Sequence, residues 1–181
     1  MHRLLQELHR DHVNLNKVLL LLEKQVDLLA EGQADFYVLS EIVDYVQVYP
    51  DLIHHPREDV IFRIYREKFP AALPAIDRLL EEHQSLISST VELSTLMEQW
   101  GCDCPVPRDH LRKLFGDYLT LQFDHLNLEE GSVYGILAQD LSKEDWARVE
   151  EEMPQGADPL FGGLMRQRYE HIFDQVMAYA A

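Results

Sequence analysis

Apolar residues recur every three or four positions over most of the chain, which predicts long amphipathic helices. In the first such stretch the apolar positions include Leu5, Leu8, Leu15 and Leu22. Gly32 follows this stretch and is a typical helix terminator. We therefore predict a first helix of about thirty residues that ends at Gly32.

The same periodicity predicts three further long helices, over about 36–68, 72–101 and 107–139. Pro50 and Pro56 fall inside the second of these and predict a kink or a local break there. Pro107 stands where the first turn of the fourth helix is expected to begin, a favoured place for proline. Short connections between such helices make consecutive helices antiparallel.

The last part of the chain contains shorter helical patterns. Residues 142–145 resemble an N-terminal cap for a short helix that ends near Pro154, and a last helix is predicted over about 160–178. No β-type alternation is evident. We expect an all-α protein, an antiparallel up-down-up-down four-helix bundle in residues 1–140, with residues 141–181 as a C-terminal helical extension of the same domain.

Composition narrows the class of partner. The chain has 181 residues, 16 Lys and Arg against 32 Asp and Glu, and a net charge of −16. Such an acidic protein repels phosphate backbones and anionic lipids, so we expect neither nucleic acid nor membrane as a partner. Cys102 and Cys104 are the only cysteines, and the first residues have no signal-peptide pattern. We expect a cytoplasmic protein without a disulfide framework.

Each of the four predicted long helices contains a histidine among its apolar positions. Two of these histidines are followed four residues later by a glutamate, which places imidazole and carboxylate on the same helix side. Buried imidazoles and carboxylates are costly unless they are paired or bind a cation. The residues concerned are His12, His54, Glu58, His83, His125 and Glu129.

Counting residues from the expected turns places the four histidines at one level. His12 and His54 lie at similar distances from the first turn, and His83 and His125 lie at similar distances from the third. The mismatches correspond to less than about 5 Å of helix rise. Two imidazoles per ion with shared carboxylates favour iron or manganese over structural zinc, and Glu58 and Glu129 are placed to bridge two ions.

These residues resemble the bacterial hemerythrin-like, or HHE cation-binding, family. The likeness rests on Leu8–His12, Tyr49–Asp59, Glu82–His83 and His125–Glu130, and it covers about residues 1–140. It implies a bundle that holds two non-haem iron ions, carboxylate-bridged with an oxo or hydroxo bridge, for which manganese or zinc are possible substitutes. The histidines would then be terminal ligands, and Glu58 and Glu129 the bridges.

One departure from the family pattern bears on function. Oxygen-carrying members have a second histidine one turn after that of the third helix, and this chain has Ile87 there. The missing histidine moves the expected role away from simple oxygen carriage. We expect a protein that binds or reacts with O₂, NO or peroxide, and the candidate activity is that of a di-iron oxidoreductase acting on NO or peroxide. The alternative is a non-catalytic iron or oxygen sensor, or a module for iron storage or donation. Homodimerisation and an electron-donor protein are possible further interactions.

Three alternatives stay open at the level of residues. In the second helix, His55 with Asp59 is an alternative ligand pair to His54 with Glu58. Pro56 lies between the histidine and the carboxylate and could shift the helical register. His9 lies one turn before His12 and is a possible fifth imidazole ligand. Glu130 competes with Glu129, because carrier hemerythrins use a carboxylate five residues after this histidine.

Overall fold

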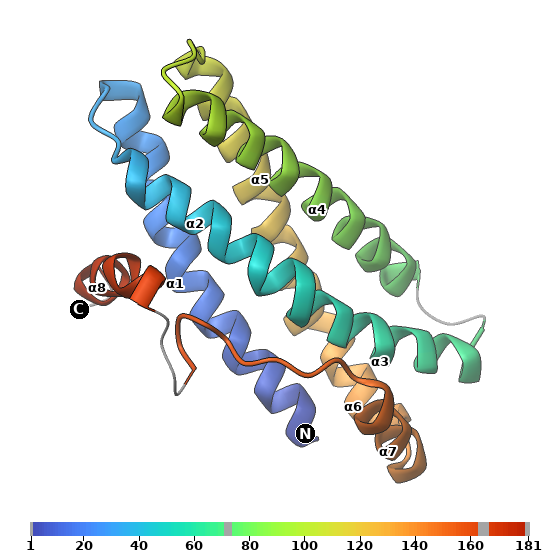
Figure 1. Cartoon of the computed structure of the whole chain (residues 1–181). Coiled ribbons are helices and arrows are strands. Elements are labelled where there is room, and N and C mark those ends of the chain that lie inside the picture. Colours follow the sequence, from blue (N-terminus) through green and yellow to red (C-terminus); the bar gives the residue numbers. More distant parts are fainter. Residues whose placement is uncertain (1, 71–73, 163–166, 180–181) are drawn as a thin grey trace.

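The computed structural model describes residues 2–70, 74–162 and 167–179 (Figure 1). These residues form helices and connecting segments, and no strand occurs among them. The helices are α1 (Arg3–Glu31), α2 (Phe36–Val48), α3 (His55–Lys68), α4 (Pro74–Gly101), α5 (Arg108–Leu128), α6 (Tyr134–Asp140), α7 (Lys143–Glu152) and α8 (Glu170–Tyr179). Two π-helical turns, η1 (Pro50–His54) and η2 (Glu129–Val133), and a 3₁₀ turn, η3 (Gln167–Tyr169), complete the elements.

Caps set the ends of the first helices. Gly32 ends α1 with a φ of 72°, a left-handed conformation in which its N–H reaches the carbonyls of Leu28 and Leu29. Asp35 begins α2, since its carboxylate accepts from the N–H groups of Tyr37 and Val38. The predicted end of the first helix at Gly32 is thus confirmed.

The break predicted in the second helical stretch is also present. Between α2 and α3 the chain makes the π turn η1, which begins at Pro50, and Pro56 lies in the first turn of α3. Proline lacks an N–H and so favours such an irregular turn over continuous α-helix. α2, η1 and α3 nevertheless form one long rod in Figure 1.

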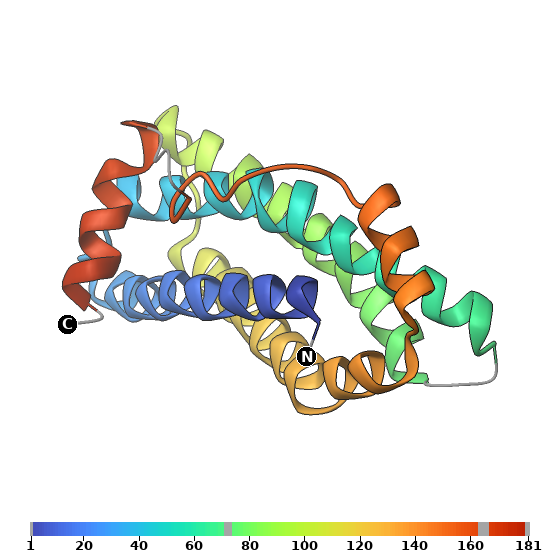
Figure 2. The same cartoon turned by 90° about the horizontal axis from the view of Figure 1, so that it is seen from below.

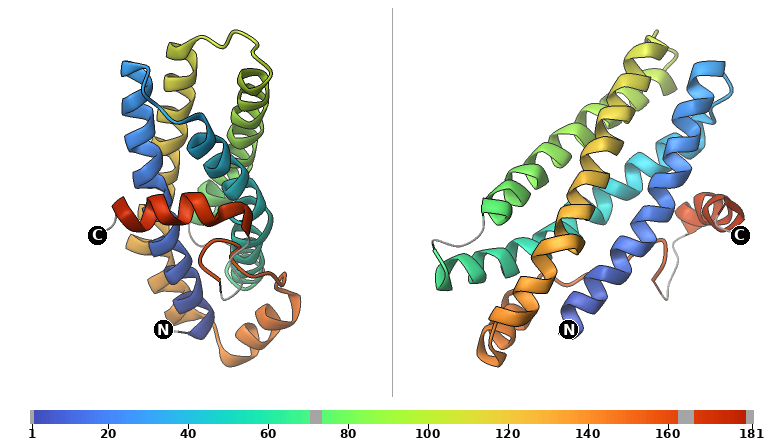
Figure 3. Two further views of the ribbon diagram at one scale, coloured as in Figure 1. Left: turned by 60° about the vertical axis from the view of Figure 1, so that its left-hand side comes forward. Right: turned by 180° about the vertical axis from the view of Figure 1, so that it is seen from behind.

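The long helical segments pack side by side in a ring. Helix α1 packs on α2 and α5, and α4 packs on the same two helices (Figures 1 and 3). η2 and α6 extend α5 beyond residue 128, and α7 turns back to pack against α3. After α7, residues 153–162 run back along the molecule, and α8 lies across α1 and α2 (Figures 2 and 3).

The start of the last helix differs from the prediction over about 160–178. Residues 159–162 form a turn in which the carboxylate of Asp158 accepts from the N–H groups of Leu160 and Phe161. The helix begins only at Glu170 and extends to Tyr179. The predicted residues 163–166 lie outside the described residues.

Two apolar clusters fill the interior, and a polar layer separates them along every long segment. On α1, Leu15 belongs to the first cluster and Leu8 to the second. On α4, Leu86 belongs to the first and Leu79 to the second. On both helices the histidine, His12 or His83, lies between the two clusters along the chain. In the described part of the chain, no helix combines the length and apolar character needed to cross a bilayer.

Candidate metal centre

The polar layer contains all six residues predicted as ligands, and each is buried. α1 contributes His12, η1 His54, α3 Glu58, α4 His83, α5 His125 and η2 Glu129. Their exposed fractions are between 0 and 4%. Residues far apart in sequence thus meet at one level of the molecule. Whether they bind a metal stays a prediction at this point.

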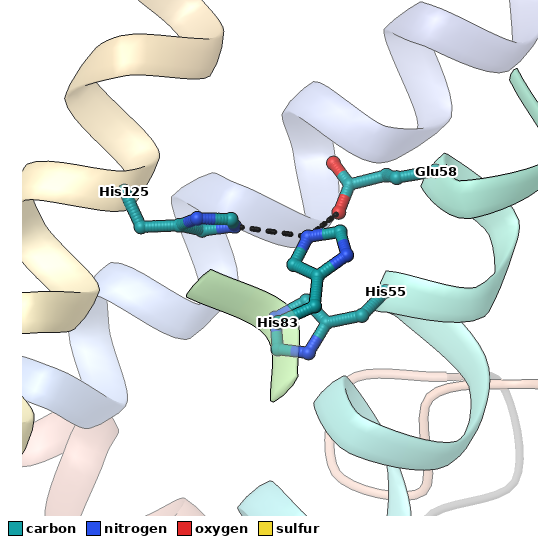
Figure 4. A group of neighbouring side chains, drawn as sticks. All are labelled: His55, Glu58, His83 and His125. Atoms are coloured by element: carbon teal, nitrogen blue, oxygen red, sulfur yellow. Dashed lines mark hydrogen bonds and ion pairs between the residues drawn. The ribbon is translucent and has the colours of Figure 1, made fainter. Parts of the chain in front are cut away.

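The imidazoles are arranged as two pairs. His12 Nε2 and His54 Nε2 lie 2.9 Å apart, and His83 Nε2 and His125 Nε2 lie 3.2 Å apart. In each pair the nitrogens converge on a common point from two different elements. Figure 4 shows His83 and His125 pointing toward each other, with Glu58 above them.

The two buried glutamates lie between the pairs. Glu58 Oε1 is 3.5 Å from His12 Nε2, while its Oε2 is 3.4 Å from His54 Nε2 and 3.5 Å from His83 Nε2. Glu129 Oε2 is 3.4 Å from His12 Nε2, and its Oε1 is 3.3 Å from His125 Nε2. Each carboxylate therefore contacts both pairs.

A second set of carboxylates holds the outer edge of each imidazole. Nδ1 of His12 donates to Glu130 at 2.8 Å, and Nδ1 of His83 donates to Asp59 at 2.7 Å. The other two rings follow the same pattern: His54 with Asp11 at 3.3 Å, and His125 with Glu82 at 3.0 Å. A carboxylate on Nδ1 keeps that nitrogen protonated and directs Nε2 inward, as is usual for metal-binding histidines.

Each of the two π turns contains one of the predicted ligands. η1 ends at His54, and η2 begins at Glu129. A π turn inserts an extra residue into the helical repeat and rotates the side chains that follow it, and such turns are frequent at functional sites. Both glutamates face the interior as a result of the local helix geometry, which Pro50 and Pro56 shape in the second segment.

The structure places the residues that the sequence left as alternatives, Glu129, Glu130 and His9. Glu129 is fully buried and inward, whereas Glu130 lies at the edge and accepts from both His9 and His12 through Oε1, at 3.0 and 2.8 Å. His9 is half exposed. His9 and Glu130 therefore support His12 from outside and do not enter the layer.

His55 is buried beside its neighbour His54 and does not point to the surface. Its ring stacks on His83 with centroids 4.5 Å apart, and its Nδ1 lies 3.5 Å from Asp51 Oδ1. One of two groups with metal-ligand geometry includes it, together with Glu58, His83 and His125, all with one donor atom within 4.8 Å of one another. His55 lies beside Glu58, His83 and His125 in Figure 4, while His54 pairs with His12, so the two neighbours do not exclude each other.

Tyr134 is a site residue that the sequence analysis did not identify. Its hydroxyl donates to Glu58 Oε1 and lies 3.3 Å from His12 Nε2. Its ring stacks on His12, with centroids 5.4 Å apart. The available signal was its spacing: Tyr134 follows His125 and Glu129 by nine and five residues, but the turn η2 makes such a count unreliable.

The electrostatics of the layer favour bound cations. Burial lowers the pKa of His12, but hydrogen bonds to Glu130 and Glu58 outweigh it and raise that pKa to about 10. Burial likewise opposes charge on His83, but its hydrogen bond to Asp59 and the nearby carboxylates of Glu129 and Glu58 raise its pKa to about 11. In the metal-free protein the carboxylates thus hold protons on the histidines, which a metal ion would replace.

The pKa values of three further groups in the site are also shifted by their surroundings. Burial opposes charge on Glu58, but the nearby histidines hold the pKa of its carboxyl well below the usual range. Burial lowers the pKa of His55 well below that of a free imidazole, so this ring is neutral. Burial and the charges of Glu58 and Glu129 raise the pKa of Tyr134, which stays a phenol.

The donor set fits a metal ion. Glu58 Oε2 and both carboxylate oxygens of Glu129 are buried and have no hydrogen-bond partner among the described residues. Buried carboxylate oxygens without partners are costly, and a cation is the usual compensation. Imidazole and carboxylate donors suit iron, manganese and zinc, and the two groups with ligand geometry share Glu58.

Comparison with known families agrees with this geometry. The model of the hemerythrin HHE cation-binding domain matches residues 3–137, which is most of the chain and contains all six predicted ligands. The chain therefore belongs to this family of cation-binding helical domains. Searches of curated proteins and of solved structures gave no match.

Proposed function

We propose that this protein holds two iron ions in the polar layer and binds or reduces a small oxidant there, O₂, NO or peroxide. One observation carries the proposal: two convergent imidazole pairs, with nitrogens 2.9 and 3.2 Å apart, share two buried carboxylates that contact both pairs. Four histidines and two glutamates are a donor set for a pair of ions in a helical bundle. The long helices would be the antiparallel four-helix bundle predicted from the sequence.

The proposed division of ligands follows the distances. His12 and His54 would hold one ion, and His83 and His125 the other, with Glu58 and Glu129 bridging both. Manganese or zinc could occupy the same donors. When bound, the iron pair would supply the redox chemistry, while the chain orients the ligands and excludes water.

The chain's own residues favour one side of the layer for the small ligand. His12 lines a pocket of about 240 Å³ that opens between α1 and α5, together with His9, Asn16, Asn127 and Glu130. The hydroxyl of Tyr134 lies 3.3 Å from Nε2 of His12, the site histidine that lines this pocket. A molecule that enters through this pocket would meet a hydroxyl able to donate a proton.

Metal analysis and optical titration test the proposal. We expect about two irons per chain after anaerobic loading with ferrous ion. O₂, NO and peroxide should then be added separately, and consumption should be followed with and without a reductant. Repeated, reductant-dependent consumption would support the enzyme. A reversible oxygenated band would support carriage, and a chain that binds no metal after loading would contradict the proposal.

A sensor, or a store or donor of iron, is the alternative in the same experiment. In that case the loaded protein would bind its ions without repeated consumption of any of the three oxidants. α8 packs against α1 and α2, so a change at the centre could reach it through these helices. Protection of the α8 amides from hydrogen exchange, compared with and without iron, would report such coupling.

A further inference from the structure

A line of buried tyrosines connects the candidate centre to the surface near α8. Asp11 joins the line to the centre, because its Oδ2 lies 3.3 Å from His54 Nδ1 and accepts a 2.8 Å hydrogen bond from Tyr49. The ring of Tyr49 lies 6.3 Å from that of Tyr45, and Tyr45 lies edge-on to Tyr169 at 6.0 Å between centroids. The three tyrosines are at most 4% exposed.

Every tyrosine in this line donates to a carboxylate. Tyr49 donates to Asp11 at 2.8 Å, Tyr45 to Asp158 at 3.2 Å and Tyr169 to Asp44 at 2.5 Å. The three carboxylates come from α1, from the segment after α7 and from α2. The pattern therefore does not follow from one local motif.

A buried hydroxyl needs a partner, but that partner need not be acidic. Tyr118 in the same apolar cluster accepts from the side-chain amide of Gln122. Carboxylates differ from amides because they are bases. A phenol that loses an electron must also release its proton, and a carboxylate at hydrogen-bond distance is placed to accept it.

The outer end of the line reaches a surface pocket. Arg168 lies over the ring of Tyr169 at 6.0 Å and forms an ion pair with Asp44, the carboxylate that accepts from Tyr169. Asp44 and Arg168 line a pocket of about 520 Å³ between α2 and α4, which also includes Gln47 and Cys102. A small reductant in this pocket would therefore contact the partners of Tyr169.

We propose that Tyr49, Tyr45 and Tyr169 form a one-electron relay between the metal centre and this pocket. The relay rests on the proposed function, since hydrogen peroxide at the centre is the oxidant. A tyrosine gives one electron toward the centre while its hydroxyl proton moves to its carboxylate, which leaves a neutral tyrosyl radical. The radical regains an electron from the next tyrosine outward and a proton from its carboxylate.

The reaction balances with an external donor. One peroxide takes up two electrons and two protons and gives two waters. Two passages along the relay supply the electrons, and each time the oxidised Tyr169 regains one electron from the donor and its own proton from Asp44. The donor releases one proton to solvent per step, and the two protons that peroxide takes up at the centre come from solvent. Ascorbate serves as the probe, because it gives one electron and one proton per step.

Electron paramagnetic resonance on the iron-loaded full-length protein tests the relay. After rapid mixing with peroxide and freezing, we expect a tyrosyl signal that narrows when the protein carries β-deuterated tyrosine. The central variant is Tyr45→Phe, because Tyr45 contacts neither His54 nor Asp11 through its hydroxyl. We expect at least a tenfold loss of ascorbate-supported peroxide consumption, with unchanged iron content and an unchanged first reaction of the reduced centre.

Two further variants keep the result interpretable. Tyr65→Phe removes another phenol–carboxylate pair, the partly buried one with Asp140 at 2.9 Å, and should behave like the wild type because Tyr65 belongs to the second apolar cluster, outside the relay. Tyr169→Phe should reproduce the loss from the outer end if Tyr45→Phe folds poorly. Wild-type ascorbate turnover in Tyr45→Phe or Tyr169→Phe would overturn the relay, as would a wild-type protein that consumes peroxide without a tyrosyl signal. A protein that takes up no iron would instead overturn the proposed function.

Discussion

The two imidazole pairs have similar distances but different surroundings. His12, of the first pair, lines a surface pocket and contacts the hydroxyl of Tyr134. In the second pair, His83 is stacked between two rings, with His55 at 4.5 Å and Phe62 at 6.0 Å. A surface pocket therefore reaches one ring of the first pair, whereas aromatic rings pack against the second. A near-symmetric ligand set can hold two chemically different positions when the neighbouring side chains differ.

Metal binding at both imidazole pairs should depend on the shared carboxylates, so their removal has the largest expected effect. We expect Glu129→Ala to reduce the metal content from two ions per chain to at most one, because it removes a donor to both positions. Metal analysis after iron loading and desalting measures this. The neighbouring variant Glu130→Ala is the matched control, since Glu130 contacts only the outer edge of His12 and His9.

In Glu130→Ala we expect two ions with an affinity lowered about tenfold. The same comparison applies to Glu58→Ala and Asp59→Ala, because Asp59 holds the outer edge of His83. Full metal content in Glu129→Ala, with loss in Glu130→Ala, would reverse the assignment of inner and outer carboxylates.

The pH should change metal affinity at both imidazole pairs alike, because each pair contains a histidine with a raised pKa. At neutral pH His12, with a pKa of about 10, and His83, with a pKa of about 11, each hold a proton that a metal must displace. The overall affinity for the two metal ions should therefore rise by about 100-fold per pH unit near neutrality, with release of about two protons. Calorimetry with manganese in buffers of different ionisation heat measures the released protons. Affinity independent of pH would contradict protonated histidines.

The same protons affect the metal-free fold with the opposite sign. The folded pKa values lie above the value of 6.5 for an unperturbed histidine, so the protons stabilise the fold fully below that pH. This stabilisation is lost as the pH rises from 6.5 through about 10 to 11. Urea unfolding of the metal-free protein across this range should show a decreasing free energy of unfolding.

Tyr134→Phe tests the hydroxyl that lies beside His12 and donates to the shared carboxylate Glu58. The variant keeps the ring that stacks on His12 but removes the hydroxyl, so metal content should not change. We expect the rate of peroxide reduction to fall by about 10²-fold, the usual contribution of a positioned proton donor. Stopped-flow mixing of the reduced protein measures this rate. An unchanged rate would place the reaction away from Tyr134.

His55→Phe tests the surroundings of the second imidazole pair, His83 and His125, and has the smallest expected effect. Phenylalanine keeps an aromatic ring against His83 but removes both nitrogens, including the one near Asp51. We expect about a tenfold weaker affinity for one ion of the two, with the other unchanged. A two-step metal titration separates the ions. Identical affinities in variant and wild type would limit His55 to packing.

Residue spacing was sufficient to predict the helical core of this protein. The four long segments, the Gly32 cap and the break near Pro50 follow from local periodicity and backbone chemistry. The six residues of the polar layer follow from the same counting, because helical rise is constant and turns are short. The turn at residues 159–162 and the later start of the last helix at Glu170 were not visible in the apolar pattern.

The sequence by itself determined the helices and the family, together with a level at which imidazoles and carboxylates accumulate. Only the tertiary structure decided that Glu129 faces inward and Glu130 outward, that His55 is buried against His83, and that Tyr134 reaches Glu58. The reason is rotational: one residue of helix turns a side chain by about 100°, and π turns change that count. Which side chains meet across helices therefore depends on packing between segments distant in sequence.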